Sequence, residues 1–444
     1  MPLEKLPFRK QVAYASGMIG WSIITNLVIV MLPYFYLPPA GKGLISLIPQ
    51  VLLFGAINIM SLVLASSRLT DAISDPIIAS LSDKSKHPHG RRIPFMRRAI
   101  LPTMLFFCLA FLPLVYSESI KNGVWLAFVL MGFFISTSLY FIPYYALLPE
   151  LTESSAEKVK LSSFLQVGFV IGMVISGCVN NIVAPVERIF KADHHTSIQY
   201  TVWGLCVLGG ICMWIPVLFI DEKKYSDSQP AHLPLLPAIR HTFSNRNFKY
   251  YLVSDFSYYL ALSIISSGLL YFVTVLLRLP ESLGGWLMGS MVLVSLICYP
   301  LIIFLAKRVG KKSVVLFSFA LLSLLFIAIF FLGKFPFEPK TQIYALMMLA
   351  GFPLAALGIL PNAILADIIQ DDEEQGGENK GGMYFAVKYF FVKIGQTTGI
   401  ALFAFLTIYG KDPGNDYGLR LNGLFGFGLC VLAFIFFSRF KEKL

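Results

Sequence analysis

The stretch RLTDAISDPIIASLSD, residues 68–83, carries charged residues inside an otherwise apolar run. Arg68, Asp71 and Asp75 are spaced so that, at about 100° per residue, they share one narrow face of a helix. The residues around them, from about 50 to 80, are apolar over a length that predicts a membrane-spanning helix. A charge at the centre of a bilayer is costly, so this face must point toward protein or water.

The composition of the whole chain indicates a membrane protein. Of its 444 residues, 56% are hydrophobic and 14% are charged, and this charged share is about half that of an ordinary soluble protein. The chain therefore predicts an all-α membrane protein with twelve transmembrane helices. The predicted spans lie near 12–37, 50–80, 99–117, 123–148, 161–185, 198–220, 249–277, 284–305, 313–333, 342–370, 382–410 and 420–438.

The loops predict the orientation and the organisation in two halves. Of the 36 Lys and Arg residues, 24 lie in alternate loops on one side, which places both termini in the cytoplasm. The longest polar connection, residues 221–248, separates an N-terminal six-helix bundle (1–220) from a C-terminal one (249–444). Basic, glycine-containing loops follow the second and the eighth span, an echo that is typical of the repeated halves of secondary transporters.

Other function classes lack their motifs in this sequence. There is no phosphate-binding glycine loop, no HExxH zinc pair and no GxSxG elbow, so we expect neither an enzyme nor a cofactor. The net charge of +11 is dispersed among loops, which argues against nucleic acid as a partner. All six cysteines lie in apolar runs, where we expect them to act as small apolar side chains. The expected partners are a small-molecule substrate and the lipid bilayer of the cytoplasmic membrane, with the protein acting as a monomer.

Asp71 and Asp75 form a candidate cation site because they lie one helical turn apart. Two carboxylates can ligate a small hard cation such as Na⁺, or share a proton, so the coupling ion is expected to be Na⁺ or H⁺. The alternative is a structural ion pair in which Arg68 neutralises one aspartate. Lys393 in the eleventh span can supply a second positive charge that the cation displaces, which would couple occupancy to helix contacts. Lys388 is the weaker candidate because it lies about 140° further round the same helix.

Polar and aromatic side chains in other spans are candidates for a substrate cavity. Aromatic rings beside hydroxyl groups suit stacking on a sugar ring or enclosing an amphipathic solute. Interhelical packing and anchoring at the membrane interface are the competing explanations. The candidate substrate-binding residues are Trp21, Ser22, Tyr145, Gln166, Asp255 and Tyr258.

The segment 68–83, followed by GRRIPF at 90–95, resembles the second span and following loop of the glycoside-pentoside-hexuronide cation symporters. That family is the melibiose-permease branch of the major facilitator superfamily. Further agreement comes from PYYALLPELT at 143–152, NRNF at 245–248, ADIIQDD at 366–372 and VKIG at 392–395. The resemblance implies the major facilitator fold of two six-helix bundles.

The resemblance also implies roles for individual residues. Asp71 and Asp75 are expected to bind the cation, with Lys393 close to them. The position of Asp367 near the inner end of the tenth span, and not the resemblance, predicts a cytoplasmic gate or cap contact with the basic loops, and the candidate gate residues are Asp83, Arg91, Arg92 and Asp367.

Substrate recognition departs from the family pattern. The three charged sugar contacts of melibiose permease fall at Ser22, Phe141 and Gln166, and none of these is charged. The leading hypothesis is a symporter that carries a small organic solute, most often a sugar or glycoside in this family, by alternating access. The family also contains Na⁺-dependent lysophospholipid carriers, which a less charged, aromatic cavity would suit. A membrane receptor or assembly factor that keeps the fold without transporting is the third alternative.

Overall fold

The computed structural model describes residues 6–38, 45–49, 52–53, 57–88, 90–152, 154–225, 235–280, 283–375, 380–410 and 412–442. Part of the predicted linker, 226–234, and the side chain of Arg68 lie outside the described residues. The long helices of the described part are α1 (Phe8–Tyr36), α2 (Ile59–Asp83), α3 (Ile93–Ala110), α4 (Ile120–Glu150), α5 (Ser155–Gly177), α7 (His194–Phe219), α10 (Arg246–Tyr271), α11 (Leu283–Val309), α12 (Lys311–Phe330), α13 (Pro339–Glu374), α14 (Gly381–Thr407) and α15 (Tyr417–Ser438).

Short elements connect some of these helices. They are α6 (Val179–Phe190), α8 (Glu222–Tyr225), α9 (Leu235–Ser244) and the π-helical turn η1 (Phe272–Leu276). Two strands of two residues each, β1 (Leu52–Leu53) and β2 (Ile57–Asn58), pair antiparallel just before α2.

The long helices correspond one to one with the predicted spans, so the prediction of an all-α membrane protein is confirmed. Among the described residues, 11 helices are long and apolar enough to cross a membrane. The remaining long helix is α2, and every 18-residue window of it contains Arg68, Asp71 and Asp75. Because of these three charged residues, α2 is not among the 11 helices that are apolar enough to cross a membrane by composition.

Several predicted boundaries differ from the observed ones. The second span was predicted from about 50, whereas α2 begins at Ile59, and the third was predicted to end near 117, whereas α3 ends at Ala110. The third span begins at Ile93, not near 99, because Pro94 lies in the first turn of α3, where a helix tolerates its missing N–H group. The fifth span was predicted to continue to 185, whereas α5 ends at Gly177 and α6 begins at Val179. The apolar run continues across this break, so hydropathy alone could not reveal it.

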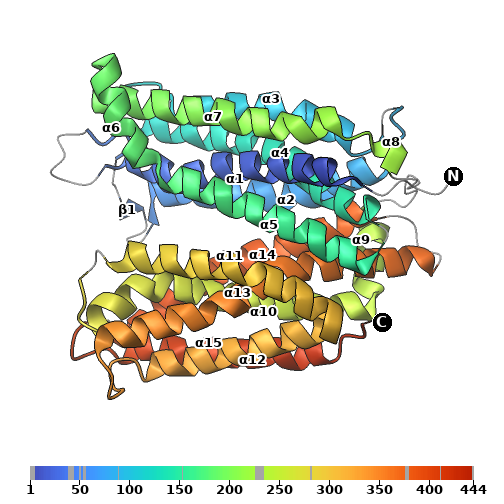
Figure 1. The fold of residues 1–444 in the computed structure, drawn as a ribbon. Helices are drawn as coiled ribbons and strands as arrows, with labels where there is room; N and C mark the ends of the chain where they lie inside the picture. The colour runs from blue at the N-terminus through green and yellow to red at the C-terminus, as the bar shows by residue number, and fades with distance from the viewer. Residues whose placement is uncertain are drawn as a thin grey trace. The chain divides into compact units, whose positions relative to one another are not determined.

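Contacts divide the chain into two compact units. Unit 1 is Met1–Glu153, Phe164–Leu235 and Glu378–Ala386, and unit 2 is Ser154–Ser163, Leu236–Gly377 and Val387–Leu444. In unit 1, α1 packs along α7, and α4 packs along α2 and α3 (Figure 1). In unit 2, α15 packs along α10 and α12, and α13 packs along α11 and α12. The first turns of α5 belong to unit 2 and those of α14 to unit 1.

Glycines four residues apart bring α5 against α1 in unit 1. A Cβ atom added to Gly168 would lie 2.7 Å from the carbonyl oxygen of Ala15. One added to Gly172 would lie 2.6 Å from the carbonyl oxygen of Ile19. No side chain fits at either position, so the two helix backbones touch, as small residues permit in membrane proteins.

The same arrangement recurs in unit 2 between α14 and α10. A Cβ atom on Gly395 would lie 3.1 Å from the carbonyl oxygen of Phe256, and one on Gly399 would lie 2.5 Å from that of Leu260. The glycines and the carbonyl groups keep the four-residue spacing seen in unit 1. Both units therefore contain a pair of helices in close backbone contact at two glycines four residues apart.

Candidate functional site

A shared hydroxyl group joins the two acidic residues of α2. The side chains of Asp71 and Asp75 are buried, with relative exposures of 5% and 1%. Ser138 Oγ of α4 lies 2.8 Å from Asp71 Oδ1 and 2.6 Å from Asp75 Oδ1. Three buried oxygens, from two acidic side chains and one hydroxyl group, therefore converge between α2 and α4.

The proposed coupling lysine belongs to the other unit. Lys393 lies on α14 in unit 2 and is half-buried, and its backbone carbonyl accepts a hydrogen bond from Thr397 Oγ1 at 2.9 Å. Its proximity to Asp71 and Asp75 stays a prediction.

Aromatic rings from α1 and α4 form a continuous wall in unit 1. The ring of Trp21 stacks on that of Phe141, with centroids 4.3 Å apart and planes at 24°. Phe141 in turn meets Tyr145 edge to face, with centroids 4.7 Å apart. Trp21 Nε1 is buried and has no hydrogen-bond partner among the described residues. The wall therefore offers an apolar surface beside one unused N–H donor.

The other two substrate candidates of unit 1 differ in their surroundings. Ser22 is buried and donates its hydroxyl to the Phe169 carbonyl of α5 at 2.6 Å. It accepts a hydrogen bond from Asn26 Nδ2 at 3.1 Å. In this arrangement Ser22 links α1 to α5 close to the glycine crossing. Gln166 lies on α5 and is half-buried.

A second buried polar cluster lies in unit 2. The side chain of Asp255 on α10 is 4% exposed, and its Oδ2 has no hydrogen-bond partner among the described residues. Tyr258, one turn further along α10, is also buried. Lys388 of α14 is 1% exposed and donates a hydrogen bond to Asn362 Oδ1 of α13. Lys388, which was the weaker candidate because of its position on the helix, is thus more deeply buried than Lys393.

Two arginines after α2 form a buried ion-pair network in unit 1. Arg92 is fully buried, with Nη1 2.5 Å from Asp83 Oδ1 and Nη2 2.9 Å from Glu150 Oε1. Arg91 Nη2 lies 2.7 Å from the same Glu150 oxygen. The carboxylate of Asp83 also accepts the backbone N–H groups of residues 382 and 383, each at 3.1 Å. An acidic side chain thereby caps the positive end of α14.

The carboxylate of Glu222 closes the turn that precedes α3. It accepts the backbone N–H groups of Arg91 at 2.6 Å, Arg92 at 2.9 Å and Ile93 at 2.9 Å. A Cβ atom on Gly90, which has a φ of +102°, would lie 2.3 Å from Glu222 Oε2, so this turn requires glycine. Burial raises the pKa of Glu222 above its ordinary value, and the three N–H bonds act in the opposite direction.

Unit 2 repeats this turn with different residues. Glu442 accepts the backbone N–H groups of Lys311 at 2.9 Å and Lys312 at 3.0 Å. Gly310 precedes them with a φ of +85°. The echo between the loops after the second and eighth spans therefore extends from their sequence to their backbone geometry.

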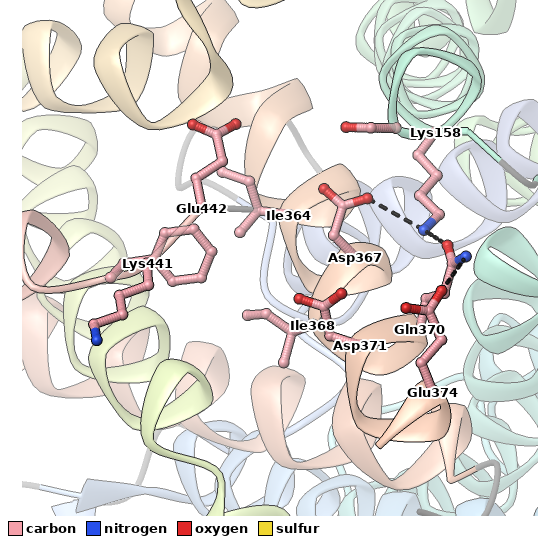
Figure 2. Close-up of a pocket in the computed structure, with 11 residues that line it drawn as sticks. Lys158, Ile364, Asp367, Ile368, Gln370, Asp371, Glu374, Lys441 and Glu442 are labelled. Carbon is pink, nitrogen blue, oxygen red and sulfur yellow. Dashed lines mark hydrogen bonds and ion pairs between the residues drawn. The ribbon is translucent and has the colours of Figure 1, made fainter. Parts of the chain in front are cut away.

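Figure 2 shows a charged pocket of about 200 Å³ in unit 2, formed by α5, α13 and the C-terminal segment. Lys158 of α5 lies 3.2 Å from Asp367 Oδ1 and donates a hydrogen bond to Gln370 Oε1. Lys311, the first residue of α12, also pairs with Asp367. Asp367 thus ties the first turns of α5 and α12 to α13.

The sequence reasoning did not single out Ser138, Lys158 or Glu222. Ser138 could have been found as a hydroxyl three residues before Phe141, a position that the family resemblance already marked. Glu222 could have been found by aligning the two glycine loops, because Glu442 follows the second loop as Glu222 follows the first. Lys158 carries no such signal.

Comparison with known proteins identifies the family. The sequence model described as MFS/sugar transport protein matches residues 13–437. The inner membrane symporter YicJ of Escherichia coli is 23% identical over 92% of this chain and 84% of its own length. The uncharacterized symporter sll1374 of Synechocystis sp. is 33% identical, over 36% of this chain and 28% of its own.

Among solved structures, the major facilitator superfamily proton:xylose symporter XylE has a similar fold, with a TM-score of 0.69 at 12% identity, over 98% of this chain and 96% of its own. The family match covers nearly the whole chain, and two relatives that align along 92% of it are described as symporters. The chain therefore belongs to the MFS/sugar transport protein family, in the glycoside-pentoside-hexuronide cation symporter branch of the major facilitator superfamily, and is a membrane transporter, not an enzyme.

Proposed function

We propose that the protein moves a sugar or glycoside across the cytoplasmic membrane together with Na⁺ or H⁺, by alternating access. The contact of one hydroxyl group, from Ser138, with both Asp71 and Asp75 carries the proposal, because three buried oxygens converge where a cation or a proton is required. Relatives described as a glycoside/cation symporter, a sulfoquinovose importer and an isoprimeverose transporter support the choice of substrate class.

Coupling follows from the charge at this site. Binding of the cation neutralises the aspartates, raises the affinity for the solute, and favours conversion of the loaded carrier. By linkage, the solute must raise the affinity for the cation by the same factor. Arg68 and Lys393 are proposed to balance the carboxylates when the cation is absent.

The substrate is proposed to bind at the aromatic wall of unit 1. A sugar ring would stack on Trp21 or Tyr145, and the unused Trp21 N–H group would donate to a substrate oxygen. Ser22 and Gln166 would supply uncharged polar contacts in place of the family's charged ones. Asp255 and Tyr258, in unit 2, remain predicted substrate-binding residues.

A gate at the helix ends is proposed to accompany each transport cycle. The Asp83 cap on α14, the pairs made by Arg91 and Arg92, and the contacts of Asp367 with α5 would break and re-form as the solute site changes sides. In this proposal both termini are cytoplasmic. Residues 1–220 and 249–444 act as two bundles joined by 221–248, and the protein acts as a monomer.

Uptake into proteoliposomes tests the proposal. Labelled sugars, glycosides and lysophospholipids would be offered under an inward Na⁺ gradient, an inward H⁺ gradient, and neither. Asp71→Asn and Asp75→Asn should abolish accumulation against a gradient, whereas Asp412→Asn, the same change at an exposed carboxylate, should leave it intact. Unchanged accumulation in both α2 variants would refute the cation site. Uptake restricted to lysophospholipids would replace the sugar with the amphipathic substrate.

A further inference from the structure

A small cavity lies inside unit 2 beside Asp255. It has a volume of about 10 Å³ and is bounded by α10, α12, α13 and α15. Such a space holds one water molecule and is far too small for a sugar ring. Asp255 and Tyr251 are among the residues that line the cavity, and neither Asp255 Oδ2 nor the Tyr251 hydroxyl group has a hydrogen-bond partner among the described residues.

The surroundings of Asp255 favour its neutral form. An ionised carboxylate that is buried without a donor is costly, and protonation removes that cost. Lys388 is the positively charged side chain that interacts electrostatically with Asp255, but it donates its hydrogen bond to Asn362. Across the described part of the chain, no ion pair joins Lys388 to Asp255. In the observed arrangement the Asp255 carboxyl oxygen Oδ2 has no hydrogen-bond donor among the described residues, and the ammonium group of Lys388 is hydrogen-bonded elsewhere.

The ammonium group of Lys388 lies near two aromatic rings as well as its hydrogen-bond partner Asn362. Its ammonium group is 5.9 Å from the ring centroid of Tyr251 and 5.0 Å from that of Tyr389. An ammonium group has three donors, and its one hydrogen bond to a described residue goes to Asn362. The aromatic faces stabilise the charge without holding its direction. An ionised carboxylate at Asp255 would attract the same ammonium group, with which it interacts electrostatically.

We propose that Asp255 is a proton-binding site in the interior of unit 2, separate from Asp71 and Asp75, and that Lys388 moves from Asn362 to Asp255 when the proton leaves. The step is a proton transfer alone. The carboxylate takes H⁺ from water through the cavity, Lys388 stays an ammonium ion, and no other covalent bond changes. Because the three residues belong to α10, α13 and α14, each proton exchange alters the contacts among three helices of one unit.

The other groups that face this site do not supply a competing charge. Tyr251 and Tyr258 share α10 with Asp255, and Tyr299 of α11 and Cys430 of α15 lie close to Tyr258. All four are neutral near pH 7 in their ordinary state. The lining residues from α12 and the remaining ones from α13 are apolar. Lys388 is therefore the charged group that responds to Asp255.

Infrared difference spectroscopy on the purified full-length protein in lipid nanodiscs reads the proton directly. At mildly acidic pH the wild-type protein should show the C=O stretch of a protonated carboxyl group, which disappears as the pH is raised. Asp255→Asn should lose one such band, and the matched variant Asp412→Asn should keep it. An unchanged carboxyl region in Asp255→Asn would overturn the proposal. This readout uses no solute, so it stands apart from any failure of the transport assay.

A second pair of variants tests the role of Lys388. Lys388→Met removes the positive partner, so the band should persist to a pH at least about one unit higher, because a nearby cation favours the carboxylate. A band that vanishes at the wild-type pH would overturn the exchange of partners. Asp255→Glu keeps the carboxyl group and should restore a band shifted in frequency. Absence of that band in a folded variant, judged by its melting curve, would count against proton binding at this position.

Discussion

Removing the hydroxyl group of Ser138 is the sharpest test of the cation site. Ser138→Ala deletes one oxygen that lies 2.8 Å from Asp71 Oδ1 and 2.6 Å from Asp75 Oδ1. A hydrogen bond to a charged group contributes about 1.5–3 kcal/mol, and each 1.4 kcal/mol is a factor of ten. We therefore expect Na⁺, which would lose one oxygen ligand, to bind about 10- to 150-fold more weakly. If the ion is H⁺, the sign is opposite, because the hydroxyl group donates to the carboxylates and its loss favours their protonated form.

The assay follows the melting temperature of the purified protein as Na⁺ is titrated at fixed pH, and as pH is varied without Na⁺. A cation that binds the folded state raises the melting temperature by mass action, so the midpoint of the rise reports its affinity. Ser136→Ala is the matched control. Ser136 is on the same helix and 3% exposed, but its hydroxyl donates only to the Phe133 carbonyl of its own helix, at 2.9 Å.

Two results would show that this reasoning is wrong. One is a Ser138→Ala protein whose cation response matches that of the wild type. The other is an equal loss in Ser136→Ala, because the effect would then come from α4 as a whole and not from the contact with the aspartates. Loss in Ser138→Ala alone assigns the cation to the pocket between α2 and α4.

Gly172→Ala should lower the melting temperature clearly, since its methyl group would meet the α1 backbone, whereas Gly177→Ala, which meets no atom within 4 Å, should not. Arg92→Met should destabilise the protein by about 3–5 kcal/mol, because it removes the ion-pair partner of the buried Asp83 carboxylate and one of the two arginines that pair with Glu150, while Arg97→Met at an exposed position should change denaturant stability little. Burial raises the pKa of Glu222, so the folded chain holds that proton more tightly than the unfolded one. Its stabilising effect is complete below the ordinary value of 4.5 and is lost as pH rises through the raised value, and Glu222→Gln should flatten this part of the melting-temperature profile.

The positions of the helices could be predicted because the bilayer leaves few choices. A chain that crosses it needs long apolar helices, and each of the twelve predicted spans corresponds to one. Asp71 and Asp75 were visible for the same reason, since charges are conspicuous in an apolar run. Where a polar residue or proline lies within apolar surroundings, the sequence carries a strong local signal.

Residues whose role depends on a neighbouring helix could not be predicted in the same way. Ser138 is one of several hydroxyl residues in α4, and only the packing of α4 on α2 distinguishes it from Ser136. Lys388 was ranked below Lys393 by its angle on α14, but its burial depends on Asn362 of α13. Such contacts join residues far apart in the chain, and helical spacing within one segment does not report them.

The glycine crossings have a mechanical consequence. At Gly168 and Gly172 the backbone of α5 rests on that of α1, and at Gly395 and Gly399 the backbone of α14 rests on that of α10. Two helices whose backbones touch at two successive turns, without flexible side chains between them, resist both sliding along and rotation about their axes. Each pair of helices should therefore move as one rigid unit. Conformational changes during the transport cycle must then take place at the other helix–helix interfaces, where side chains can change their rotamers.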